Sequence, residues 1–115
     1  MIVQTFVDKS ESVAKENFSY ATVNYDKENG IIEMDVAHNG LSNDIAMMKL
    51  GVLDASTWDV VKESTNATCK VMKDELVELG VDDVHVTLNI LNDANLENVL
   101  FSTLNGITFY DVIAE

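Results

Sequence analysis

The sequence predicts an α+β domain in which an antiparallel sheet of about five strands is packed by one long helix. Segments of alternating apolar residues occur in two groups, one of two and one of three, joined by turn-forming residues. Segments with helical apolar spacing precede the first group and separate it from the second. The expected order is helix, two strands, one or two helices, three strands, and such grouping is typical of α+β proteins.

The first predicted elements are a helix over residues 2–18 and a hairpin. Apolar residues recur at near-helical intervals in the helix, although "DKSES" interrupts them. "YATVNY" and "IIEMDVAH" then alternate on either side of "DKENG", which predicts two paired strands. Their buried face should hold Ala21, Val23, Tyr25, Ile32, Met34 and Val36.

Two helices are expected in the middle of the chain. "LSNDIAMMKLGVLD" offers Ser42 or Asn43 as an N-cap. The apolar face of this short helix should hold Leu41, Ile45, Met48 and Val52. The longer helix begins at "STWD", where Asp59 follows Ser56 at capping-box spacing, and it ends at Gly80. Its apolar stripe comprises Trp58, Val61, Thr65, Thr68, Met72, Leu76 and Leu79.

The last three strands begin with "VHVTLNIL", whose alternation indicates a half-buried strand. Asn105-Gly106 predicts a type I′ turn, so that residues 98–104 pair with residues 107–113. A two-residue turn places Leu104, Ile107 and Phe109 on one face of this hairpin. The other face then carries Phe101 opposite Tyr110 and Val99 opposite Val112.

Both faces of this hairpin are therefore apolar, although a single helical layer covers only one. Either the N-terminal helix covers the second face, or another chain does. On the second alternative, the candidate interface consists of Val99, Phe101, Tyr110 and Val112.

Length and composition favour a single domain over residues 1–115, with 47% hydrophobic residues to form its core. No stretch has the length of a membrane span, and the N-terminus lacks the features of a signal peptide. We expect a cytoplasmic protein without membrane insertion; a trimmed exported domain is the alternative.

The charge is strongly acidic, with 20 Asp and Glu against seven Lys, no Arg, and a net charge of −13. Such a chain repels nucleic acid and anionic membranes, so a charged partner should be basic. Nine acids and no Lys or Arg follow Lys73. The candidate acidic contact patch comprises Asp74, Glu75, Glu78, Asp82 and Asp83; a solvated, solubilising fringe is the alternative reading.

No catalytic, cofactor-binding or metal-binding residue is assigned, and no cofactor is expected. Cys69 should be a small buried hydrophobe, and His38 and His85 should face solvent without a special role. "NDANLEN" spaces oxygen ligands like a calcium loop but lacks its glycine and its final glutamate.

The sequence therefore predicts a non-enzymatic protein-interaction domain, with self-association through the C-terminal hairpin as the mode of contact. Two alternatives remain at this point. One is an acidic inhibitor that imitates nucleic acid and binds a basic protein. The other is a small-molecule-binding or enzymatic domain with its pocket between sheet and helix.

Overall fold

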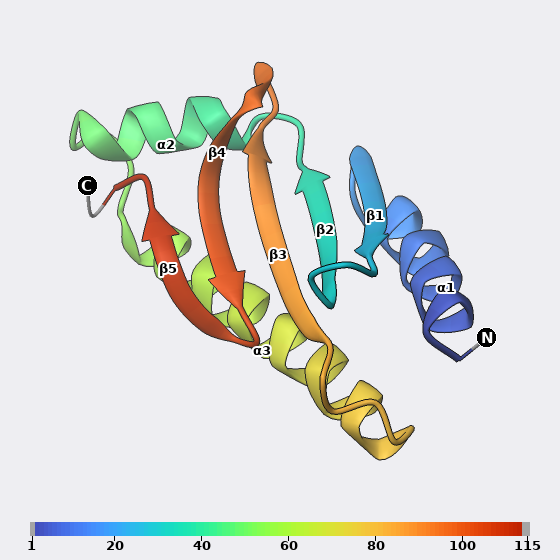
Figure 1. Cartoon of the computed structure of the whole chain (residues 1–115). Helices are drawn as coiled ribbons and strands as arrows, with labels where there is room; N and C mark the ends of the chain where they lie inside the picture. The colour runs from blue at the N-terminus through green and yellow to red at the C-terminus, as the bar shows by residue number, and fades with distance from the viewer. Residues whose placement is uncertain (1, 114–115) are drawn as a thin grey trace.

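The computed structural model describes residues 2–113, which form a five-stranded sheet and three helices (Figure 1). The α+β class and the predicted order of elements are confirmed. The elements are α1 (Ile2–Asn17), β1 (Tyr20–Asp26), β2 (Ile31–Ala37), α2 (Leu41–Lys49), α3 (Ser56–Glu78), β3 (His85–Asn92), β4 (Asn95–Leu104) and β5 (Ile107–Asp111).

The sheet is mixed, so the prediction of a purely antiparallel sheet was wrong in one pairing. The strands lie in the order β1-β2-β3-β4-β5, and β2 pairs with β3 in parallel. The other three pairs are antiparallel. Between β2 and β3 the chain passes through α2 and then α3, which returns along the sheet, so β3 starts from the same end as β2 (Figure 1).

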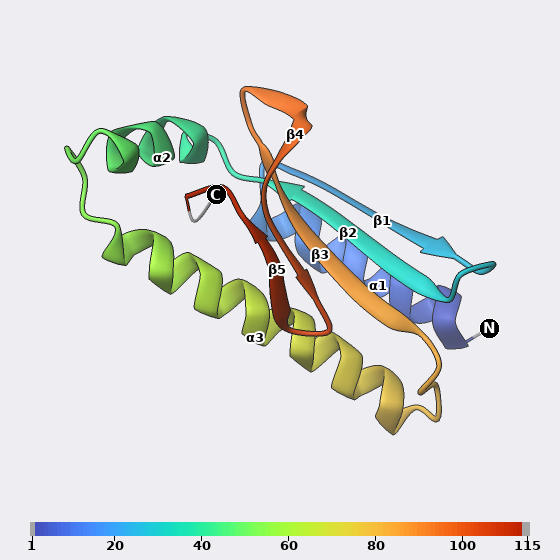
Figure 2. The same cartoon turned by 60° about the vertical axis from the view of Figure 1, so that its left-hand side comes forward.

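Helices α1 and α3 cover the same face of the sheet (Figure 2). The buried side chains Phe6 of α1 and Met72 of α3 both belong to one core with Met34 of β2. The alternative in which the N-terminal helix covers the second face is therefore wrong. A helix is about 10 Å across and neighbouring strands lie about 4.8 Å apart, so a five-stranded sheet needs two helices to cover one face.

Helix α2 receives its N-terminal cap from the turn between β3 and β4. The helix begins at Leu41, with Gly40 in the N-cap position at φ 91°, so the predicted N-cap at Ser42 or Asn43 was wrong. The carboxylate of Asp93 accepts hydrogen bonds from the backbone N–H groups of Gly40 (2.9 Å) and Ser42 (2.8 Å). Burial raises the pKa of Asp93, but these hydrogen bonds outweigh it and hold the pKa below its ordinary value.

Replacing Asp93 with alanine should destabilise the domain by about 1 to 2 kcal/mol at pH 7, as the loss of an N-cap does. Because the folded-state pKa of Asp93 is lowered, its contribution is present above the unfolded pKa of about 3.9. It is lost as the pH falls through the folded-state pKa. Urea denaturation of both proteins at pH 7 and at low pH measures this loss.

Asp44→Ala is the matched control, because Asp44 lies in the first turn of α2 without a capping hydrogen bond. Equal losses for the two variants at pH 7 would contradict the cap.

The beginning of α3 also differs from its prediction. Ser56 is the first helical residue, and its N–H group donates to the carboxylate of Asp54 at 2.9 Å. The capping box between Ser56 and Asp59 is therefore absent, and a side chain in the preceding loop binds the first turn instead. Val52, predicted on the buried face of α2, lies beyond the end of that helix and is 70% exposed.

The turn at Asn105-Gly106 is confirmed, with φ of 52° and 92° at its two residues. Asn105 joins the turn to β3, because its N–H group donates to the carbonyl of Val86 and its side-chain oxygen accepts from the N–H group of Val86, both at 2.8 Å. Gly106 lies against α3, where an added Cβ would meet the Cβ of Lys70 at 2.8 Å.

Beyond the turn, β4 and β5 do not keep the predicted register. Leu104 lies opposite Ile107 as expected, but the register shifts between residues 102 and 103. Residue 109 is left without a partner, so that Phe101 lies opposite Asp111 instead of Tyr110. The extra residue in β5 places Tyr110 on the face of Ile107 and Asp111 on the face of Phe101, the reverse of what uninterrupted alternation from Ile107 predicts.

Candidate functional site

Phe101 belongs to the core and not to a contact surface. It is fully buried, and its ring packs edge-on against Trp58 of α3 with centroids 5.9 Å apart. Asp111, its neighbour across the strands, points to the same helix. A residue that α3 covers so completely cannot contact another chain, so its assignment to the candidate interface was wrong.

Asp111 fixes the end of β5 to the beginning of α3. Its carboxylate accepts hydrogen bonds from the indole N–H of Trp58 at 2.9 Å and from the amine of Lys62 at 2.7 Å. Burial raises the pKa of Asp111, but these two hydrogen bonds outweigh it and lower the pKa. The hydrogen bond to Asp111 likewise raises the pKa of Lys62. The pair is thus held in its charged form and is structural.

The other three predicted interface residues come together on the second face of the sheet. Val99, Tyr110 and Val112 are half-buried and, with Phe109, line a hollow of about 650 Å³. Toward the turn this region continues into apolar side chains that were expected on the covered face. We call the whole set the hairpin surface: Val99, Leu104, Ile107, Phe109, Tyr110 and Val112.

The exposure of the hairpin surface is greatest at β5. Ile107 is 75% exposed, Phe109 62% and Leu104 41%. Alternation grouped Phe109 with Leu104 and Ile107, but it could not show that α3 packs on the opposite face of the hairpin, where Phe101 meets Trp58.

A polar ladder crosses the second face beside the hairpin surface. The amide of Asn89 donates to the carboxylate of Asp35 at 2.8 Å, and the hydroxyl of Ser102 donates to the side-chain oxygen of Asn89 at 2.6 Å. These residues lie side by side on β2, β3 and β4, and Tyr110 follows on β5. The second face is therefore polar at its centre and apolar along β5.

The two edges of the sheet differ in their protection. On β1 the backbone N–H of Val23 donates to the carboxylate of Glu11 at 3.3 Å, and α1 packs beside this strand. On β5 the only charged side chain, Asp111, is turned inward to Trp58. Charged residues at an edge normally discourage pairing with another chain, and β5 exposes none; its length of five residues and its bulge limit backbone pairing, so contact would depend on its side chains.

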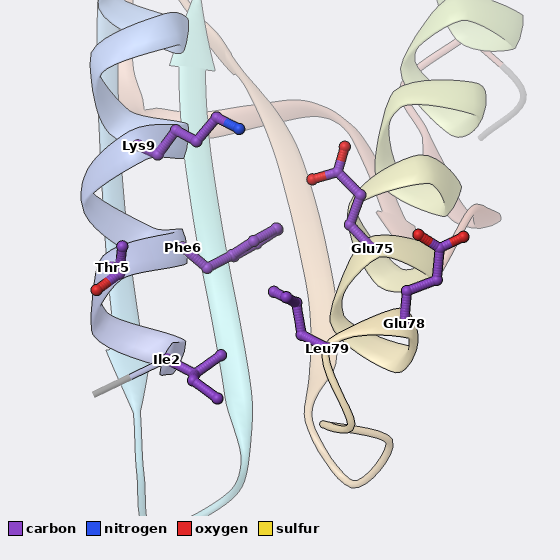
Figure 3. A pocket seen from close by; sticks show the side chains of 7 residues that line it. All are labelled: Ile2, Thr5, Phe6, Lys9, Glu75, Glu78 and Leu79. Atoms are coloured by element: carbon purple, nitrogen blue, oxygen red, sulfur yellow. The ribbon is translucent and has the colours of Figure 1, made fainter.

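The predicted acidic patch is divided in the structure. Asp74 forms an ion pair with Lys70 at 3.0 Å. Lys73 donates to the backbone carbonyls of Asp82 (3.0 Å) and Val84 (2.6 Å), so the loop after α3 is held by a lysine. Glu75 projects from α3 toward α1 instead, and Glu78 borders the same hollow, although its carboxylate does not point at α1 (Figure 3).

Between α1 and α3 lies a groove, which we call the helix groove. The two helices run in opposite directions, and Phe6 and Leu79 point toward each other across the gap (Figure 3). Two hollows of about 630 and 430 Å³ follow one another along it, and a third of about 300 Å³ continues beyond the end of α1, between α3, the sheet and the start of α2. The first and second share the walls Phe6, Lys9 and Glu75, and the second and third share Phe18, Met34 and Thr68.

The residues with reactive side chains show no catalytic arrangement within residues 2–113. Cys69 is fully buried, its thiol donates to the carbonyl of Val86 at 3.3 Å, and burial raises the thiol pKa. His38 and His85 are exposed, as predicted. Asp93, the first acid of the calcium-like segment, caps α2, and the described residues contain no cluster of side chains suited to a metal ion.

Over the same range, no helix combines the length and the apolar character needed to cross a bilayer. Comparison of the chain with protein-family models, with curated proteins and with solved structures finds no match.

Proposed function

We propose that the chain is a non-enzymatic protein-interaction domain that self-associates through the hairpin surface. The observation that carries the proposal is the exposure of Ile107 (75%) and Phe109 (62%) on an edge strand without an exposed charge. Contiguous exposed apolar side chains are a feature of contact surfaces, and aromatic residues are enriched in them.

A two-fold arrangement suits the shape of this surface. The hollow lined by Val99, Tyr110 and Val112 lies beside the protruding Phe109. In a two-fold dimer the same patch meets itself, so that Phe109 of each copy would enter the hollow of the other. The association would bury the apolar side chains of β5 and leave the polar ladder at the rim.

Charge opposes this association at long range, since each copy carries a net charge of −13. The surface itself is formed by uncharged side chains. Salt screens repulsion between like-charged molecules, so the dimer should become more stable as the ionic strength rises.

Phe109→Glu should convert the dimer to a monomer with an unchanged circular dichroism spectrum. The variant places a charge in the centre of the interface, whereas the exposed side chain contributes little to the core of the monomer. Multi-angle light scattering over a range of protein and salt concentrations measures the mass.

Val71→Glu is the matched control, because Val71 is 54% exposed on α3, away from the hairpin surface. It should leave the mass of the dimer unchanged. A monomeric parent protein at every concentration, or equal masses for the parent and Phe109→Glu, would overturn the proposal.

A further inference from the structure

The helix groove remains apolar and open along its length. Phe6, Met34 and Met72 are buried in its floor and walls. Val13 and Leu79 on its rims are 51% and 50% exposed. The groove lies on the helical face of the sheet, opposite the hairpin surface, so self-association through β5 leaves it uncovered.

The rim contributed by α3 is acidic. Glu75 and Glu78 border the groove, and among residues 2–113 neither carboxylate has a hydrogen-bond or ion-pair partner. Lys9 on the α1 rim faces Glu75 across the gap without forming an ion pair (Figure 3). The last turn of α3 contains no basic residue, although the helix dipole favours cations there. A Lys or Arg side chain of a bound partner would pair with these carboxylates and would supply the cation that the end of the helix favours.

The strands in the floor of the groove determine which backbone conformation a bound peptide can have. Met34 and Leu88 belong to β2 and β3, the strands beneath the groove, and each of these strands is already paired on both sides. An extended peptide in the groove would therefore find no free strand edge to pair with. A helix forms its backbone hydrogen bonds internally, so it can bind in the groove without leaving its N–H and C=O groups unpaired.

We propose that the helix groove binds an amphipathic basic helix of another protein, with apolar side chains in the three hollows and Lys or Arg beside Glu75 and Glu78. A second copy of this chain is disfavoured here, because it would bring its net charge of −13 onto a rim that is itself acidic, whereas the hairpin surface is uncharged. This inference is independent of the hairpin surface.

The test uses the full chain carrying Phe109→Glu, so that self-association does not interfere. The probes are two fluorescein-labelled synthetic helices with the same leucine pattern, one with lysine and one with glutamate at every polar position. The lysine helix should bind, the glutamate helix should not, and added salt should weaken the binding. Fluorescence anisotropy measures both affinities.

Variants locate the binding site. Glu75→Gln with Glu78→Gln should weaken the lysine helix roughly fivefold, as expected for the loss of two exposed ion pairs. Glu16→Gln with Glu28→Gln removes the same charge elsewhere and should have much less effect. Lys9→Gln should strengthen binding, because it removes the cation on the opposite rim.

The methionines provide a second readout. Met34 and Met72 line the groove, whereas Met47 and Met48 belong to α2. With methyl-labelled methionine, the resonances of Met34 and Met72 should shift on adding the lysine helix, and those of Met47 and Met48 should not. No binding, equal effects of the two glutamine pairs, or shifts confined to α2 would each overturn the proposal.

Discussion

Phe101→Ser should cost about 4 kcal/mol or more of the free energy of unfolding, a large part of the roughly 5 to 15 kcal/mol that an ordinary domain has. The change removes a fully buried ring that packs against Trp58 and places a hydroxyl in the same apolar site. Urea denaturation followed by tryptophan fluorescence measures the loss, because Trp58 is the only tryptophan in the chain.

Phe109→Ser is the matched control on the same hairpin. Its ring is 62% exposed, so the variant should lose less than about 1 kcal/mol of monomer stability. Comparable losses at the two positions would contradict the packing of α3 on the face of Phe101, which leaves Phe109 exposed.

Gly106→Ala should destabilise the domain by about 2 to 4 kcal/mol. Gly106 has φ 92°, a conformation that costs an L side chain roughly 1 to 2 kcal/mol. The added methyl group would also lie 2.8 Å from the Cβ of Lys70, which cannot move without displacing α3 or the turn. Thermal and urea denaturation measure the loss.

Gly80→Ala separates these two costs. Gly80 has a similar φ of 85°, but no atom lies within 4 Å of the position of an added Cβ. Only the conformational cost of about 1 to 2 kcal/mol should therefore appear. Equal losses for the two variants would show that the turn does not pack on α3 as closely as described.

The sequence by itself determined the features that depend on neighbouring residues. The helix at residues 2–17, the hairpin of β1 and β2, and the long helix α3 follow from local periodicity. The turn at Asn105-Gly106 follows from the φ angles that these two residues adopt readily. Cys69 was correctly placed in the core, because it lies beside the apolar stripe of α3.

Only the tertiary structure decided the pairing of strands that are distant in sequence. A helical connection between strands is compatible with either direction of pairing, and the path of α3 along the sheet makes β3 parallel to β2. The N-cap of α2 depends on Asp93, which lies 51 residues beyond Ser42 in the chain. Sequence windows that cover a single helix cannot contain such a partner.

The candidate contact surfaces were predicted in part from the sequence, and the tertiary structure decided the rest. Alternation along the hairpin indicated that both faces carry apolar residues, but the position of α3 decided that the face of Phe101 is buried and that the face of Ile107 is exposed. A one-residue bulge then brought Tyr110 to the exposed face. Composition predicted that a charged partner should be basic, but the position of α1 beside α3 decided that Glu75 and Glu78 border an apolar groove. Alternation has a period of two, so a single inserted residue inverts it, and the distance between two helices on a sheet is set by packing that no local pattern records.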